Sequence, residues 1–193
     1  ITVSLDSLDA DRFVAITRRG RLDRVIAGID AAAEAGFHSV KLNTVAIRGF
    51  NDDEFASIAR WAWAREVVPR FIELMPMSAG ELFVPGTLMP AAQVRDTIAA
   101  SLGATLAAAG PSDGPTGPAT YHVVQGGAQG HDWSGRVLGT IAAMTENFCA
   151  GCNRLRITAT GQLHGCLAHD DAGDLRGVLR EQGADALELV VRH

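Results

Sequence analysis

The sequence contains no run of about 20 apolar residues, which is the length that a membrane-spanning helix requires. It also lacks an excess of basic residues, because 17 lysines and arginines stand against 22 aspartates and glutamates, giving a formal net charge of −5. Proteins that bind nucleic acid or membrane surfaces generally carry basic surfaces, so we expect neither kind of partner. A local cluster of arginines would still be sufficient to bind a phosphate group.

Cysteine is scarce as well. The sequence has three cysteines, and all of them lie within 18 positions, at Cys149, Cys152 and Cys166. A secreted disulfide framework usually has an even number of cysteines spread along the chain, and no secretory signal is present. We therefore expect these cysteines to bind a metal in a reducing cytoplasm.

The first half of the chain alternates between strand and helix patterns. The predicted strands are Ile1–Asp6, Ser39–Ile47 and Pro69–Met75, and the predicted helices are Arg21–Ala35 and Asn51–Glu66. Asn51 with Glu54 three residues later predicts a capping box at the start of the second helix. Strands separated by helical crossovers favour a parallel sheet. Because the chain begins directly in a strand, we interpret this α/β region as the last part of a β/α barrel.

The second half follows a different pattern. A loop is predicted over Pro76–Met89 and a helix over Ala91–Leu102, followed by a Gly- and Pro-rich loop, Gly110–Ala119. Short antiparallel strands are predicted beyond it, over Tyr121–Val124, Arg136–Ala142, Arg154–Thr158 and Gln162–Cys166, with a hairpin turn at Thr160-Gly161 and helical patterns from Asp174. We therefore expect a partial barrel over residues 1–108 and a separate C-terminal region over residues 109–193.

The cysteines follow the pattern C-x2-C-x13-C, and the predicted hairpin would return Cys166 toward Cys149 and Cys152. Three thiolates can hold a [4Fe–4S] cluster and leave the fourth iron open to a further ligand. A structural zinc site, with His164 or His169 as the fourth ligand, fits the same spacing.

Two arginines lie close to the cysteine pattern. Arg154 and Arg156 are two residues apart in a strand-like run, so their side chains share one face. Guanidinium groups there would suit an anionic ligand and would favour the thiolate form of nearby cysteines. Alternatively, the pair is only the charged face of a solvated edge strand.

The segment FCAGCNRLRITATGQLHGCL resembles the C-terminal cluster motif of the MoaA family, the GTP 3′,8-cyclases of molybdenum cofactor biosynthesis in the radical S-adenosylmethionine (SAM) superfamily. Further segments agree in order and spacing: VSLDSLD from Val3, ITRRG from Ile16, VKLNTVAIRGFNDDE from Val40 and RFIELMPM from Arg70. The resemblance covers nearly the whole chain. It implies an incomplete (β/α)6 barrel followed by a C-terminal region of short antiparallel strands and helices that carries a second cluster.

The resemblance also implies the chemistry. A first [4Fe–4S] cluster on an N-terminal C-x3-C-x2-C motif binds SAM and cleaves it to a radical, which removes the 3′ hydrogen of GTP before the sugar carbon bonds to C8 of guanine. The second [4Fe–4S] cluster binds the guanine end of GTP. The product passes to the cyclic pyranopterin monophosphate synthase, and the intact protein is expected to be a cytoplasmic homodimer.

Residue by residue, the resemblance assigns three groups of positions in this chain. The second-cluster ligands are Cys149, Cys152 and Cys166. The GTP contacts are Lys41, Arg70, Arg154, Leu155 and Arg156, and the SAM contacts are Ser4, Asn43 and Met75. Arg70 and Met75 are five residues apart, so they cannot both face inward from one regular strand. Met75 would therefore either lie beyond the strand end or contact the cofactor through its backbone.

This chain departs from the family pattern in two ways. No cysteine remains for the first cluster, and the sequence ends at His193 without the family's Gly-Gly tail. We expect a fragment that supplies GTP and second-cluster binding without generating the radical itself. Two other functions remain open: another radical SAM enzyme with an auxiliary cluster, and a non-catalytic zinc-binding α/β domain.

Overall fold

The computed structural model describes residues 1–76, 86–110, 117–128, 130–146, 152, 154–166 and 171–183. The chain divides into two compact units, Ile1–Phe148 (unit 1) and Cys149–His193 (unit 2), and each is described by itself. No helix among the described residues is long and apolar enough to cross a bilayer.

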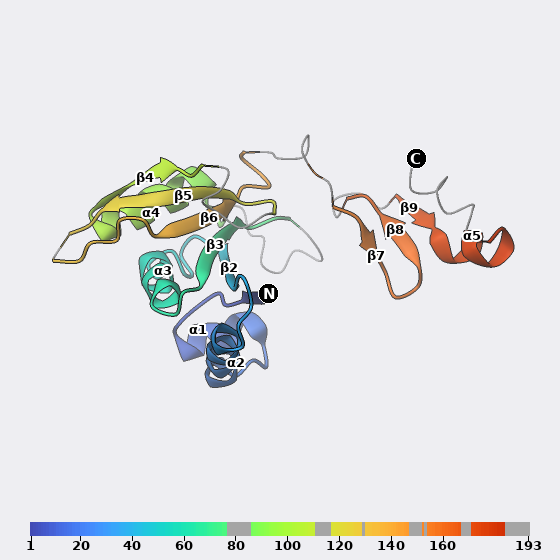
Figure 1. Ribbon diagram of the computed structural model, residues 1–193, viewed down its shortest axis with the longest axis horizontal. Coiled ribbons are helices and arrows are strands. Elements are labelled where there is room, and N and C mark those ends of the chain that lie inside the picture. Colours follow the sequence, from blue (N-terminus) through green and yellow to red (C-terminus); the bar gives the residue numbers. More distant parts are fainter. Residues whose placement is uncertain are drawn as a thin grey trace. The chain divides into compact units, whose positions relative to one another are not determined.

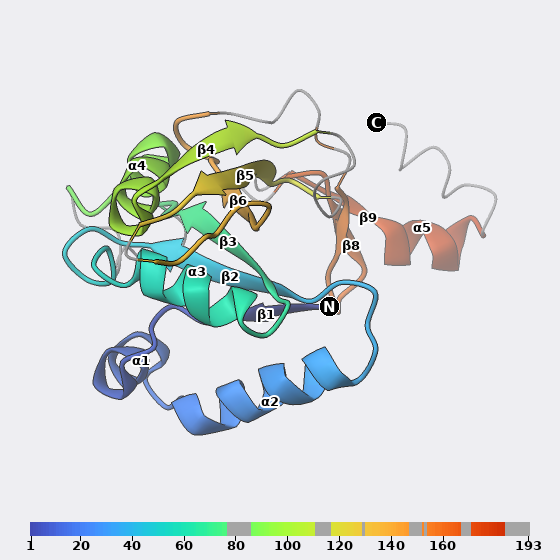
Figure 2. The same ribbon diagram turned by 60° about the vertical axis from the view of Figure 1, so that its left-hand side comes forward.

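Unit 1 is a mixed α/β structure. Its elements are, in chain order, β1 (Thr2–Ser4), α1 (Ala10–Thr17), α2 (Leu22–Glu34), β2 (Lys41–Ala46), α3 (Phe55–Trp63), β3 (Val68–Glu73), α4 (Ala91–Leu102), β4 (Ala104–Ala108), β5 (Thr120–Gly126) and β6 (Val137–Ile141). The strands form one sheet in the order β1-β2-β3-β6-β5-β4 (Figures 1 and 2).

The sheet is parallel from β1 to β6 and antiparallel beyond it. β1, β2, β3 and β6 pair in parallel, whereas β5 pairs antiparallel with both β6 and β4. The parallel arrangement of the first three strands is therefore confirmed. A domain boundary between residues 108 and 109, as expected from the sequence, would separate β4 from β5, which are hydrogen-bonded neighbours in one sheet. The compact units divide after residue 148.

The core of unit 1 lies between one face of this sheet and helices α3 and α4. Alternate residues of β2, Leu42, Thr44 and Ala46, are buried, and Phe55 of α3 packs edge-on against Phe71 of β3 at 5.3 Å between ring centroids. The opposite face of β2 carries half-buried Lys41 and Asn43. The period-two alternation therefore separates an apolar packing face from a polar one.

The alanine-rich run after Pro90 forms both a helix and a strand. Helix α4 ends at Gly103, whose φ of 60° lies in the left-handed region that glycine adopts readily. The chain then continues directly as β4, a strand that the sequence analysis did not predict. The alanine-rich composition is the same on both sides of Gly103, so the sequence pattern did not indicate where the helix ends and the strand begins.

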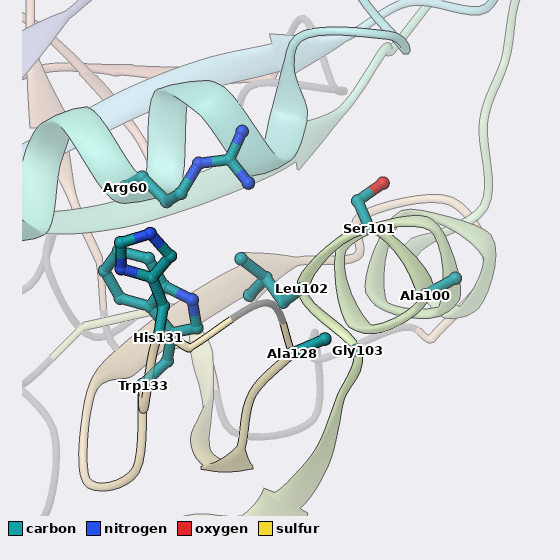
Figure 3. Close-up of a pocket in the computed structure, with 8 residues that line it drawn as sticks. All are labelled: Arg60, Ala100, Ser101, Leu102, Gly103, Ala128, His131 and Trp133. Atoms are coloured by element: carbon teal, nitrogen blue, oxygen red, sulfur yellow. The ribbon is translucent and has the colours of Figure 1, made fainter.

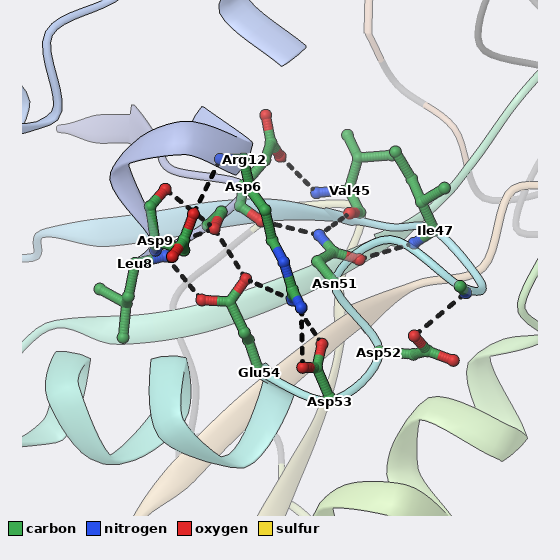
Figure 4. Close-up of polar contacts among 12 residues, drawn as sticks. Asp6, Leu8, Asp9, Arg12, Val45, Ile47, Asn51, Asp52, Asp53 and Glu54 are labelled. Carbon is green, nitrogen blue, oxygen red and sulfur yellow. Dashed lines mark hydrogen bonds and ion pairs between the residues drawn. The ribbon is translucent and has the colours of Figure 1, made fainter. Parts of the chain in front are cut away.

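Asn51 does not cap α3, so the predicted capping box is wrong. The helix begins at Phe55 with Glu54 as its N-cap residue, and that cap makes no side-chain hydrogen bond. The Asn51 amide instead connects three backbone segments: its Oδ1 accepts from Ile47 N, and its Nδ2 donates to Asp6 O and Val45 O (Figure 4). Asn51 is fully buried, so its hydrogen bonds fix the loops that follow β1 and β2.

Two acidic residues secure the same loops. Asp6 Oδ1 accepts from Val45 N at 2.8 Å, and Glu54 accepts from the Ser7 hydroxyl at 2.7 Å and from Leu8 N at 3.0 Å (Figure 4). Burial raises the pKa of Asp6, against a smaller lowering effect of the Val45 amide. The carboxyl ends of β1 and β2 are therefore held by polar side chains.

Glu73 is a buried carboxylate at the end of β3. Its Oε1 accepts from Ala91 N at the start of α4 and from the Thr145 hydroxyl, and its Oε2 accepts from Met144 N at 2.7 Å and Thr145 N at 2.9 Å. One side chain, only 2% exposed, thus joins β3, α4 and the turn that follows β6. This turn lies shortly before Cys149 in the sequence.

Unit 2 contains a smaller sheet and one short helix. Strands β7 (Arg156–Ile157), β8 (Gln162–His164) and β9 (Ala172–Asp174) are antiparallel in that order, and α5 (Leu175–Glu181) follows. The predicted hairpin is confirmed, with Gly161 at φ 80° in its turn. β7 is shorter than predicted, so Arg154 lies before the strand. Asp174 caps α5 by accepting from Gly177 N at 3.0 Å.

The raised pKa of Asp6 predicts that the contribution of this residue to the free energy of unfolding depends on pH. The folded protein holds a proton on Asp6 at pH values where the unfolded chain has lost it, so the Asp6 contribution to stability falls as pH rises through the folded pKa. In urea titrations, we expect wild type to gain stability relative to Asp6→Asn as pH falls from 7 toward 4.

Asp132→Asn provides the matched control for this titration. Hydrogen bonds from Ser134 lower the pKa of Asp132, so its contribution is present above the unfolded value and is lost only at lower pH. The difference between wild type and Asp132→Asn should stay flat from pH 7 to 4. The same flat profile for Asp6→Asn would contradict the assignment.

Replacing Glu73 tests its role in joining three segments. Glu73→Gln would turn an amide N–H toward backbone donors, so we expect the free energy of unfolding to fall by about 2–4 kcal/mol in urea denaturation. Glu66→Gln is the control, because this side chain is 82% exposed and pairs only with Arg136 among the described residues. Its loss should stay within about 0.5 kcal/mol. Equal small losses would show that Glu73 is not a structural anchor.

Candidate functional site

The polar face of the unit 1 sheet carries the residues expected to contact SAM and GTP. Ser4 pairs with Asn43, and Asn43 pairs with Arg70, so these residues form one row across β1, β2 and β3. Lys41 lies on the same face of β2, two residues before Asn43. The exposure varies across the row: Ser4 is exposed, Lys41 and Asn43 are half-buried, and Arg70 is buried. The structure therefore brings Ser4, Asn43 and Arg70 together.

Arg70 is the most constrained of these residues. Its side chain is 6% exposed, its Nε donates to Asn43 Oδ1 at 2.9 Å, and its Nη2 donates to Thr2 Oγ1 at 3.3 Å. Among the described residues these side-chain partners are neutral. A buried guanidinium that has no carboxylate partner in the described part of the chain could be balanced by an anionic ligand.

Met75 lies beyond the strand that carries Arg70. β3 ends at Glu73, and Met75 is half-buried in the segment that follows. The expectation that Met75 would lie past the strand end is confirmed. The structure does not place Met75 in the row that contains Arg70.

Unit 2 carries two of the three expected metal ligands in described positions. Cys152 is exposed and Cys166 is half-buried, and neither is joined in a disulfide. The third ligand, Cys149, and the alternative ligand His169 lie outside the described residues. Within the described part of the chain, no three histidine, cysteine or acidic side chains gather as a metal site. His164, the other alternative, is half-buried on β8.

The β7–β8 hairpin turns the chain back toward the segment that follows Cys152. In the β7–β8 ladder, Arg156 pairs with His164 and Ile157 with Leu163. The same register, continued past the strand ends, sets position 154 opposite position 166. This register directs Cys166 toward the segment that holds Cys152, whereas Cys149, the other cysteine that it was expected to approach, lies outside the described residues.

The arginines of unit 2 act on the cysteine at position 152. The backbone N–H of Arg154 lowers the pKa of the Cys152 thiol most strongly, and the Arg154 side chain and the charge of Arg156 lower it further. Both arginines are half-buried, whereas Leu155 between them is 57% exposed. The expected effect of the arginines on a nearby thiol is confirmed for Cys152.

The donor chemistry of unit 2 fits a thiolate-bound metal centre. Metal binding requires the thiolate form, and Cys152 is already shifted toward it by local hydrogen bonds and cations. Cys166 supplies a second reduced sulfur in the same unit. The two described thiols are therefore chemically suited to a thiolate-bound metal centre, and the third expected ligand, Cys149, lies outside the described residues.

A cavity of about 360 Å³ lies elsewhere in unit 1 (Figure 3). It is lined by the last turn of α4, by Arg60 of α3, and by His131 and Trp133, whose rings stack at 5.6 Å. None of the residues expected to bind SAM, GTP or a metal lines this cavity. We therefore do not assign the ligand site to it.

Glu73 and Asn51 are buried polar residues whose roles the sequence analysis did not identify. Each lies in a segment that carried the family resemblance, Glu73 in RFIELMPM and Asn51 in VKLNTVAIRGFNDDE. A charged residue directly after the apolar pair Phe71 and Ile72 was the available signal for Glu73. Its partners, Ala91 and Thr145, are distant in sequence, so the pattern could not identify them.

Comparisons with known proteins agree along the whole chain. The family model Molybdenum Cofactor Synthesis C matches residues 67–193, and the Radical SAM superfamily model matches residues 1–62. A GTP 3′,8-cyclase of Pelotomaculum thermopropionicum is 46% identical over 189 residues, covering 98% of this chain and 55% of that protein.

Two further relatives give the same result. GTP 3′,8-cyclases of Brucella ovis and Rhodopseudomonas palustris are each 44% identical, over 96% and 97% of this chain and over 50% and 51% of their own lengths. The chain thus spans about half the length of the curated relatives it matches. Because the Molybdenum Cofactor Synthesis C model covers well over half of the sequence, the chain belongs to the molybdenum cofactor synthesis C family, with a radical SAM superfamily segment preceding it.

Proposed function

We propose that the protein carrying this chain is a GTP 3′,8-cyclase, which uses radical SAM chemistry to form (8S)-3′,8-cyclo-7,8-dihydroguanosine 5′-triphosphate in the first step of molybdenum cofactor biosynthesis. The observation that carries the proposal is the combination of Cys152, Arg154, Arg156 and the returning Cys166 in unit 2. Relatives named for this activity are 44–46% identical over nearly the whole chain, which supports it.

In this proposal, unit 2 binds the second [4Fe–4S] cluster and part of GTP. Cys149, Cys152 and Cys166 would hold the cluster, which when bound offers an iron with an open position for a ligand atom of the nucleotide. Arg154 and Arg156 would bind the anionic part of GTP by charge-assisted hydrogen bonds. Exposed Leu155 would supply an apolar or backbone contact between them.

Unit 1 would contribute the polar face of its sheet. Arg70 is already oriented by Asn43 and Thr2, so it can meet a phosphate without losing much side-chain freedom. Lys41 would add a second cation to the GTP contacts, and Ser4, Asn43 and Met75 would contact SAM. The sheet would form the later strands of an incomplete (β/α)6 barrel.

The first cluster would belong to a part of the protein outside this chain. All three cysteines are assigned to the second cluster, so this chain offers no thiolate for the first. The fragment would therefore bind GTP and the second cluster without generating the radical. We further propose a cytoplasmic homodimer that passes its product to the cyclic pyranopterin monophosphate synthase.

The metal content tests the proposal directly. After anaerobic reconstitution with iron and sulfide, we expect iron and sulfide to bind this chain with the absorbance of a [4Fe–4S] cluster. Cys166→Ser should lose most of that signal because one thiolate ligand is removed. Since the chain has three cysteines, all in one motif, the signal reports only the second cluster. Stoichiometric zinc with no iron uptake would instead support the zinc-binding domain.

The GTP contacts of unit 2 are tested by charge removal. Arg154→Ala and Arg156→Ala should each weaken GTP binding by about 1.5–3 kcal/mol while changing guanosine binding little, because guanosine lacks the phosphates. Isothermal titration of both ligands measures the difference.

Arg180→Ala is the matched control, because Arg180 is exposed in the last turn of α5 in the same unit. It should leave both affinities unchanged. If the Arg154 and Arg156 variants lose GTP and guanosine affinity equally, the arginines serve the cluster or the fold rather than the phosphates.

A further inference from the structure

The polar row on the unit 1 sheet continues beyond Arg70. In the ladder between β3 and β6, Arg70 pairs with Gly139, and in the ladder between β6 and β5, Gly139 pairs with Tyr121. Residues directly opposite each other in neighbouring strands share one face of the sheet. Tyr121, the only tyrosine in the sequence, therefore lies on the same face as Arg70, one strand beyond Gly139.

Gly139 allows this close approach of Tyr121 and Arg70. A Cβ atom at position 139 would lie 2.9 Å from Tyr121 Cε1 and 3.1 Å from Arg70 Cγ. The first distance is shorter than carbon atoms tolerate. The space above Gly139 is therefore already occupied by the tyrosine ring on one side and the arginine stem on the other.

The Tyr121 hydroxyl lacks a partner in this arrangement. It is buried, and within the described part of the chain no atom forms a hydrogen bond with it. Buried hydroxyls almost always have a partner, so an orphaned one marks a place where a water or ligand completes the structure. Arg70, on the same face, is buried with only neutral side-chain partners among the described residues.

We propose that the Tyr121 hydroxyl is a further GTP contact, which donates a hydrogen bond to a phosphate oxygen that also faces Arg70. This inference rests on the proposed function and adds a residue that neither the family resemblance nor the comparisons assign. A phosphate suits both the Tyr121 hydroxyl and the Arg70 guanidinium, because its oxygens accept a hydrogen bond from the hydroxyl and balance the charge of the guanidinium. Ser4, the expected SAM contact, lies at the other end of the row, across β2, β3 and β6.

Tyr121→Phe tests this inference, because it removes one oxygen and keeps the ring that packs over Gly139. The protein without nucleotide should be as stable as wild type or slightly more stable, since the hydroxyl has no described partner to lose. With the cluster reconstituted, we expect GTP affinity to fall roughly 10- to 150-fold, as for a lost hydrogen bond to a charged group. Guanosine affinity should not change.

Thr44→Val is the matched control. The Thr44 hydroxyl is also buried, but it lies on the opposite face of β2 and donates to Leu5 O at 2.7 Å. Its removal should lower stability and leave GTP affinity unchanged. Tyr121→Phe is therefore expected to lower GTP affinity without lowering stability, whereas Thr44→Val is expected to lower stability without lowering GTP affinity.

The possible outcomes distinguish this inference from the proposed function. If wild type binds GTP and Tyr121→Phe binds it equally well, the inference is wrong and the proposed function stands. If Tyr121→Phe weakens guanosine binding as much as GTP binding, the phosphate contact is wrong. If reconstituted wild type does not bind GTP at all, the proposed function and the inference fail together.

Discussion

The burial of Arg70 is the constraint on which the polar face of unit 1 depends. Arg70 is 6% exposed, so its guanidinium needs acceptors within the protein, and the parallel register supplies two neutral ones from neighbouring strands. Asn43 is directly opposite on β2, and Thr2 of β1 reaches the same group. On the other side, β6 has to present a glycine, because the stem of Arg70 and the ring of Tyr121 fill the space that a side chain would need.

This arrangement explains how one sheet serves both folding and binding. Leu42, Thr44 and Phe71 face the helices and are buried in the core, while Lys41, Asn43 and Arg70 point to the other side. The loops beyond the strands are held by side-chain hydrogen bonds rather than by apolar packing alone, as at Asn51 and Glu73. A face made rigid in this way keeps its polar groups oriented before any ligand arrives.

The sequence allowed the local patterns to be predicted better than the long-range pairings. Alternation in residues 39–47 and the crossover spacing were sufficient for the parallel strands, and Thr160-Gly161 was sufficient for the hairpin. Nothing local indicated that β6 would pair in parallel with β3, because that contact joins residues about 70 positions apart. The capping-box pattern at Asn51 failed for a related reason: its side chain found backbone partners in two other loops, and those contacts displaced the local cap.

The candidate site was predictable from the sequence where the residues that interact are close together along the chain. Arg154 and Arg156 affect Cys152 from two and four positions away, so sequence proximity alone indicated a shifted thiol. An exposed cysteine with a lowered pKa, such as Cys152, would be prone to oxidation if it had no further role, and its place in a three-cysteine motif is better explained by metal ligation. Tyr121 could not be found in this way, because its significance arises only from the register that places it beside Gly139 and Arg70. The Tyr121 hydroxyl resembles the Arg70 guanidinium in one respect. A buried polar group that lacks a hydrogen-bond or charge partner among the described residues is most simply explained by a ligand that supplies one.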